Sequence, residues 1–330
     1  MESTTKTKLT REDLECLVWK QFGCGLKDYS ESGEGMMNSI YRIRLERPVP
    51  DQEVILKVSY FPGKEILTYE REIMRAEVLV YQLLEGKGVP IPKVLCHDFS
   101  HTMLDADYFF MTPVLGVSWK SVKEELSLEE KAELKKELGK YQAILHSISG
   151  EAFGYYKEGK SGFVTWAEAF SSMIWDITED GRMRRVSLPY EEIRSAVSKR
   201  KDLLNEITVP RLVDFDLWAG NVLLDKKSGA WYISAIIDFE RAFFGDPFAD
   251  FIAAVELYTE IGRETQFLEG YRTVDKEFQV TEHDRERMKL YSLYLNTIMA
   301  VETYRFEENY GKMMQEYCSR NIDKLLGELA

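Results

Sequence analysis

Residues 211–251, RLVDFDLWAGNVLLDKKSGAWYISAIIDFERAFFGDPFADF, hold the most informative pattern in this chain of 330 residues. Asp216 and Asn221 lie five positions apart, and Asp238 follows the apolar run 233–237. The segments VLL and ISAII have the composition of strands, and KKSG between them is typical of a hairpin turn. Such a hairpin would return Asp238 to the side of Asn221.

These three polar residues suit phosphoryl transfer. Mg²⁺ prefers oxygen ligands and usually takes one or two carboxylates together with substrate phosphates, which the side chains of Asn221 and Asp238 can provide. Asp216 can accept the proton of an attacking hydroxyl. Because phosphoryl transfer depends on positioning and charge neutralisation more than on covalent help from the protein, these residue types are sufficient. We therefore predict Asp216 as catalytic base and Asn221 and Asp238 as metal ligands.

The same stretch resembles the motifs of the aminoglycoside phosphotransferase and choline kinase superfamily. The family pattern is roughly H-G-D-x-x-x-x-N, then V/I-I-D-[WF]-E, then G-D-P. The matching residues, in order and at appropriate spacing, are Asp216, Asn221, Asp238, Glu240, Gly245, Asp246 and Pro247. A single D-x₄-N arises easily by chance, whereas three motifs in register favour the family. Asp214 departs from the pattern, since the family usually has a histidine there that supports the loop.

The resemblance implies an α+β, two-lobed protein-kinase-like fold. We expect a small N-lobe over residues 1–112, with an antiparallel sheet and one long helix, and a larger, mainly helical C-lobe over residues 113–330. Residues 38–46 and 54–60 are rich in β-branched and aromatic residues, as strands are. Residues 108–116 form an apolar run that reads as a buried strand at the end of the N-lobe.

Helical periodicity places the long N-lobe helix at about residues 65–86. Capping signals at Ser127 and Thr281 open two further helices in the C-lobe. Residues 150–200 show only short amphipathic pieces. The apolar stripe of the N-lobe helix recurs at steps of three and four residues, at Ile66, Tyr69, Ile73, Val80 and Leu84.

The resemblance also implies a strand lysine that contacts the nucleotide phosphates and pairs with a glutamate of the long helix. Lys57, in the apolar segment VILKV, is the candidate. A lysine that snorkels at a strand edge is the alternative. On the helix, Glu77 falls inside the apolar arc and Glu70 at its edge, and a buried carboxylate needs a cation. We expect Lys57 to pair with Glu77, with Glu70 as second choice.

Two further segments resemble nucleotide-binding parts of the superfamily. SGEGMMNSIYRI is similar to the phosphate-covering loop, in which glycines let backbone N–H groups approach a phosphate closely. A plain hairpin with glycines is an equally good interpretation of that segment. YFFMTPVLG is similar to the interlobe linker that holds the nucleotide base. The residues implied are Gly33, Gly35 and Asn38 in the loop, and Phe110, Met111 and Pro113 in the linker.

Composition excludes several classes of protein. A net charge of −13 disfavours nucleic-acid binding, which depends on a basic footprint. No apolar run approaches the length needed to span a bilayer, and no secretory signal opens the chain, so we expect a cytoplasmic protein. The four cysteines have no metal-ligand spacing and are expected to be reduced. We expect a monomer or a weak dimer.

The prediction from sequence is thus a phosphotransferase that uses ATP or GTP with Mg²⁺. Most of the net negative charge lies in residues 151–330, which suits an aminoglycoside, as in antibiotic resistance, or a similar amine-bearing alcohol. Ordinary surface solvation explains the same charge equally well. DLWAGN is also similar to the loop of ketosamine and fructosamine kinases, and choline, homoserine or a macrolide remain alternative acceptors. A regulatory module that binds nucleotide without turnover is the alternative from another class.

Overall fold

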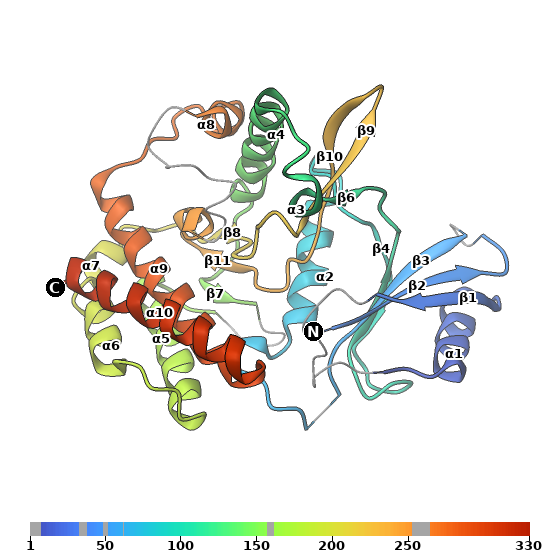
Figure 1. Ribbon diagram of the computed structural model, residues 1–330, viewed down its shortest axis with the longest axis horizontal. Coiled ribbons are helices and arrows are strands. Elements are labelled where there is room, and N and C mark those ends of the chain that lie inside the picture. Colours follow the sequence, from blue (N-terminus) through green and yellow to red (C-terminus); the bar gives the residue numbers. More distant parts are fainter. Residues whose placement is uncertain (1–7, 33–37, 49–51, 62, 157–161, 253–264) are drawn as a thin grey trace.

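The computed structural model describes residues 8–32, 38–48, 52–61, 63–156, 162–252 and 265–330. The elements divide into a sheet-containing lobe and a larger helical lobe (Figure 1). Within the described residues, no helix combines the length and apolar character that crossing a membrane requires.

The smaller lobe is built on a five-stranded antiparallel sheet with strand order β1-β2-β3-β5-β4. Helix α1, Arg11–Phe22, begins with a capping box at Thr10 and lies beside this sheet (Figure 1). The expected strands at 38–46 and 54–60 are present as β2 and β3. The strand bounds are Leu26–Glu31 for β1, Ser39–Leu45 for β2, Glu53–Val58 for β3, Val94–Asp98 for β4 and Tyr108–Met111 for β5.

The long helix of this lobe is shorter than its apolar stripe predicts. Helix α2 spans Ile73–Leu84, and residues Thr68–Glu70 form a separate 3-10 turn, η1. Between them Glu72 has a φ of 64°, which interrupts the helix. The cause is tertiary, because the backbone N–H and the hydroxyl of Thr68 donate to Asp180 of the other lobe at 2.5 and 3.0 Å. Hydrogen bonds to another element override helix propensity here.

The larger lobe is mainly helical. The capping boxes expected at Ser127 and Thr281 are both present. The interpretation of residues 150–200 as short pieces was wrong, because Trp166–Met183 form one 18-residue helix, α5, capped by Thr165. The remaining helices are α3 (Trp119–Val122), α4 (Leu128–His146), α6 (Tyr190–Ser198), α7 (Lys201–Leu204), α8 (Gln266–Tyr271), α9 (Glu282–Glu302) and α10 (Glu308–Glu328), with 3-10 turns η2 (Pro247–Ile252) and η3 (Thr303–Arg305).

The predicted hairpin forms between the lobes as β9, Val222–Lys227, and β10, Ala230–Ile236. Lys227 pairs with Ala230 across a two-residue turn. Both turn residues, Ser228 and Gly229, have positive φ, as a type I′ hairpin turn requires. The other short strands are β6 (Val117–Ser118), which pairs with β9, and β7 (Gly154–Tyr155), β8 (Arg211–Val213) and β11 (Phe243–Gly245), which form a three-stranded sheet in the order β7-β11-β8.

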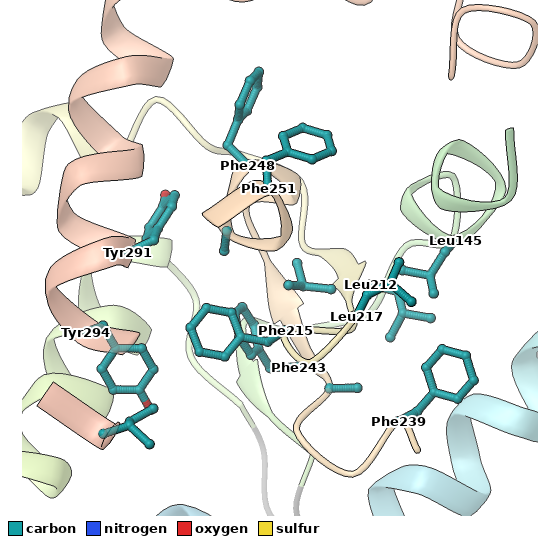
Figure 2. Close-up of a cluster of buried hydrophobic side chains, with 14 of the residues drawn as sticks. Leu145, Leu212, Phe215, Leu217, Phe239, Phe243, Phe248, Phe251, Tyr291 and Tyr294 are labelled. Atoms are coloured by element: carbon teal, nitrogen blue, oxygen red, sulfur yellow. The ribbon is translucent and has the colours of Figure 1, made fainter. Parts of the chain in front are cut away.

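Two hydrophobic clusters make up the core. The smaller cluster joins α1 to the five-stranded sheet, whereas α2 contributes its apolar face to the larger cluster, together with the helices of the C-lobe. In the larger cluster Phe215 lies between Phe243 and Tyr294, with ring centroids 5.3 and 5.6 Å away (Figure 2). A lobe boundary at residue 112 stays a prediction. The two hydrophobic clusters do not follow the order of the chain, because α2 precedes this residue but packs with the helices of the C-lobe.

Candidate active site

The loop that carries Asp216 follows β8 and is fixed by a buried carboxylate. Asp250 accepts hydrogen bonds from the backbone N–H groups of Asp214 and Phe215 at 3.1 and 2.5 Å. His146 adds a contact to Asp250 at 2.8 Å, so this histidine is a buried support of the loop. Phe215 has a φ of 62°, a conformation that non-glycine residues rarely adopt. The hydrogen bonds and the packing of its ring hold Phe215 in that conformation.

Asp216 and Asn221 lie together, as their spacing predicts. Asn221 Nδ2 donates to the backbone carbonyl of Asp216 at 2.9 Å and to its carboxylate Oδ2 at 3.2 Å. The side chain of Asp216 is 30% exposed, so it is accessible to a substrate. Burial of the carboxylate raises the pKa of Asp216 to about 7, although the guanidinium of Arg241 opposes this shift. A carboxylate with a pKa near neutrality is well suited to accept a proton.

The hairpin brings Asp238 back beside Asn221. The N–H of Ile237 donates to the carbonyl of Asn221 at 3.0 Å, and this hydrogen bond closes the base of the hairpin. Asp238 has a φ of 70° and donates its own N–H to the hydroxyl of Tyr81, on α2, at 3.1 Å. The loop, the hairpin and α2 are thereby joined at one point.

Lys57 reaches the same point from β3 and lies among three carboxylates. Its Nζ is 2.7 Å from Glu77, 2.6 Å from Asp238 and 3.5 Å from Glu240. Burial disfavours the charged ammonium, but the carboxylates outweigh it and raise the pKa of Lys57 well above its ordinary value. Burial also raises the pKa of Glu77 to about 7. The structure thus joins Lys57 to Glu77, whereas Glu70 pairs with Arg305 at 2.8 Å.

The donor set fits a divalent cation. Glu77, Asp238 and Glu240 each offer a carboxylate oxygen, and these atoms lie within 4.8 Å of one another. Asn221 turns its amide nitrogen toward Asp216, so its carboxamide oxygen is the atom that it could offer to a metal. Carboxylate and carboxamide oxygens are the ligands that Mg²⁺ prefers. A Mg²⁺ ion bound to this carboxylate set would compete with the ammonium of Lys57 for Asp238.

The structure describes only some of the residues expected to hold the nucleotide. Asn38 is buried, and its Nδ2 donates to Glu240 at 2.6 Å, while Gly33 and Gly35 lie outside the described residues. Phe110 and Met111 belong to β5, which pairs with β3 on one side and β4 on the other. In the linker that follows, before Pro113, the N–H of Thr112 donates to the carbonyl of Lys93 at 2.9 Å.

Comparison with known proteins agrees with this geometry. A model of the phosphotransferase enzyme family (APH) matches residues 31–291 of the chain. The chain belongs to the phosphotransferase enzyme family. Its resemblance to the aminoglycoside phosphotransferases, predicted from the motifs, is confirmed.

Individual relatives of this phosphotransferase family member are distant. A candidate ketoamine kinase of Enterococcus faecium is 25% identical over 187 residues, which span 53% of this chain and 62% of that relative's length. The crystal structure of a candidate fructosamine-3-kinase from Thermobifida fusca is 18% identical, with a TM-score of 0.64 over 96% of this chain and 100% of that one. The aminoglycoside phosphotransferase APH(4)-Ia, solved with ADP and hygromycin B, is 17% identical, with a TM-score of 0.61 over 95% and 98% of the two chains. These likenesses confirm the two-lobed fold.

Several site residues of this phosphotransferase family member were missed by sequence reasoning. Arg241 lies 3.9 Å from Asp216 and 2.9 Å from Glu302. Glu240 was recognised as part of a motif, but its place among possible metal ligands was not foreseen. Phe215 stands at the glycine position of H-G-D, a second departure from the family pattern that the motif comparison overlooked. The positions of Glu240 and Phe215 within the motifs were the available signals, whereas nothing in the sequence singled out Glu302.

Proposed function

We propose that the chain is a Mg²⁺-dependent kinase that transfers a phosphoryl group from ATP or GTP to a hydroxyl of a small molecule. One observation carries the proposal: Lys57 of the sheet lies 2.6 Å from Asp238, at the hairpin whose base is hydrogen-bonded to Asn221, and Asn221 holds Asp216. This arrangement supports the proposal, because the proposed cation for phosphate, oxygen ligands for a metal and proton acceptor lie close together.

Each residue has a distinct task in this proposal. Asp216 accepts the proton of the acceptor hydroxyl at its partly exposed carboxylate, while Asn221 donates a hydrogen bond to one oxygen of that carboxylate. Lys57 binds nucleotide phosphate, and Glu77 keeps its ammonium in place. Asn221, Asp238 and Glu240 would hold Mg²⁺, which neutralises charge on the phosphates when it is bound. The complexes of APH(4)-Ia with ADP and with AMP-PNP support a nucleotide as phosphoryl donor.

The acceptor we propose is an amine-bearing polyol, a class that includes aminoglycosides and ketosamines. The relatives support this class, because they are named for ketoamine, fructosamine and aminoglycoside substrates. The net charge of −13 also suits an acceptor that carries a cationic amine.

Release of ADP and GDP, coupled to an optical readout, tests the proposal. The panel contains ketosamines, aminoglycosides, macrolides, choline and homoserine, with Asp216→Asn as the inactive control. We expect release that depends on an amine-bearing polyol and is lost in the control. Binding of Mg-nucleotide without release on any acceptor would favour the regulatory module, and a chain that binds no nucleotide would contradict the proposal altogether.

A further inference from the structure

Arg241 lies beside the proposed base and has no assigned role. Its side chain is only 15% exposed, and its Nε lies 3.9 Å from Asp216 Oδ1. Its Nη2 is 2.9 Å from Glu302 Oε1, at the end of α9. Arg241 therefore connects the Asp216 carboxylate to the end of helix α9.

The two oxygens of the Asp216 carboxylate face different nitrogen donors. Oδ2 accepts a hydrogen bond from Asn221 Nδ2 at 3.2 Å, whereas Oδ1 faces the guanidinium of Arg241. A carboxylate held by one partner can still rotate about its terminal bond, because that torsion is broad. The positive charge of Arg241, 3.9 Å from the other oxygen, favours the orientation in which Oδ1 faces the guanidinium, and hence one direction for accepting a proton.

Arg241 is itself held in place by buried partners. Glu302 Oε1 accepts hydrogen bonds from Arg241 and from the hydroxyl of Tyr69, a residue of η1. The guanidinium carbon also lies 5.5 Å from the centre of the Tyr69 ring. Glu302 thereby balances the buried charge of Arg241.

We propose that Arg241, braced by Glu302, is a positioning residue that orients the Asp216 carboxylate toward the acceptor hydroxyl. This inference rests on the proposed role of Asp216 as base. The competing explanation is that Arg241 and Glu302 form a purely structural ion pair, which holds α9 against the loop. This explanation makes different predictions for the kinetics and for the geometry of Asp216.

The kinetic test compares Arg241→Gln and Arg241→Lys with Arg287→Gln. Arg287 is a matched control, because it is also a buried arginine and forms an ion pair with Asp246 at 2.8 Å. We expect Arg241→Gln to lower kcat about 100-fold with KM for MgATP nearly unchanged, since a small misplacement of a reacting group has an effect of this size. Arg241→Lys should recover part of kcat, and Arg287→Gln should lower the melting temperature but leave kcat within about 3-fold. Equal kcat losses in the Arg241→Gln and Arg287→Gln variants would overturn the inference.

A structural test does not depend on turnover. Crystal structures of the unmodified chain and of Arg241→Gln report the position of the Asp216 carboxylate, and we expect the hydrogen bond from Asn221 to Oδ2 to be lost or shifted in the variant. An unchanged carboxylate overturns the inference. If Arg241→Gln does not fold, Glu302→Gln replaces it, because it releases Arg241 and should displace Asp216 in the same way. A chain that releases no ADP on any acceptor would remove the proposed function, while these structures would still decide whether Arg241 orients Asp216.

Discussion

Asn38 donates a hydrogen bond from Nδ2 to Glu240 Oε2 at 2.6 Å, although the two residues are 202 positions apart in the chain. The bond joins the start of β2 to the segment that follows Asp238, and Glu240 also lies 3.5 Å from Lys57. Asn38, in the segment expected to cover the phosphates, is therefore in direct contact with a proposed metal ligand.

Glu240→Gln should weaken activation by Mg²⁺ because it removes one of the three clustered carboxylates. The amide keeps the shape of the side chain, so the melting temperature should change little. We expect the Mg²⁺ concentration for half-maximal activity to rise about 10-fold, the size typical for loss of a supporting group at a metal site. A titration of ADP release against Mg²⁺ measures this shift. Glu129→Gln, at an exposed position of α4, serves as control, and an unchanged Mg²⁺ requirement in Glu240→Gln would exclude Glu240 as a ligand.

Glu77→Gln should raise KM for MgATP while the fold persists. The substitution removes the carboxylate 2.7 Å from Lys57, so the ammonium is drawn toward Asp238 and away from the phosphates. We expect about a 10-fold loss of kcat/KM, equivalent to about 1.4 kcal/mol. Steady-state kinetics with varied MgATP checks this result. Tyr81→Phe is the comparison that keeps the charge of Glu77, although its hydroxyl contacts both Glu77 at 3.2 Å and the N–H of Asp238 at 3.1 Å. We expect the smaller loss of kcat/KM in Tyr81→Phe, and an equal loss in both variants would contradict a role for the Glu77 charge.

Asp214→Asn should change how stability depends on pH. Burial, reinforced by Asp250 and Asp216, raises the pKa of Asp214 well above its ordinary value. The folded chain then binds this proton more tightly than the unfolded chain, whose aspartates titrate near about 4. The contribution of this bound proton to the free energy of unfolding is complete at low pH. It is lost as the pH rises through the pKa of Asp214 in the folded chain.

The measurement for Asp214→Asn is thermal unfolding at about pH 5 and about pH 9. The unmodified chain should lose stability relative to the variant at the higher pH, because the asparagine carries no proton to lose. Asp202→Asn, at an exposed position of α7, should show no such trend. A difference between the unmodified chain and Asp214→Asn that stays constant with pH would show that Asp214 is ionised in the folded chain.

Phe215→Gly restores the family's residue yet should destabilise the chain. A glycine relieves the strain of a φ of 62°, worth about 1 kcal/mol. It also removes a ring that is 1% exposed, and loss of a buried phenylalanine costs about 3–5 kcal/mol. Packing outweighs strain, so chemical denaturation should show a net loss of about 2–4 kcal/mol. Gly229→Ala, at an exposed turn with φ of 88°, should lose only about 1 kcal/mol, and a more stable Phe215→Gly would contradict this estimate.

The fold and the centre of the site were predictable because they depend on local patterns. The turn KKSG fixes the hairpin, and the hairpin alone is enough to place Asp238 beside Asn221. Periodicity on one helix was also enough to choose Glu77 over Glu70. The contacts of Arg241 and the late start of α2 depend on Glu302 and Asp180, which are distant in the sequence. No local pattern in the sequence predicts such tertiary contacts.

The assignment of α2 to the larger hydrophobic cluster has a consequence for how the two lobes are joined. Helix α2 is anchored by its apolar face and, just before it, by the hydrogen bonds of Thr68 to Asp180. Glu77 lies on this helix, whereas Lys57 lies on β3, whose buried apolar residues belong to the smaller cluster. The buried ion pair between Lys57 and Glu77 is therefore a polar connection between two separate hydrophobic cores.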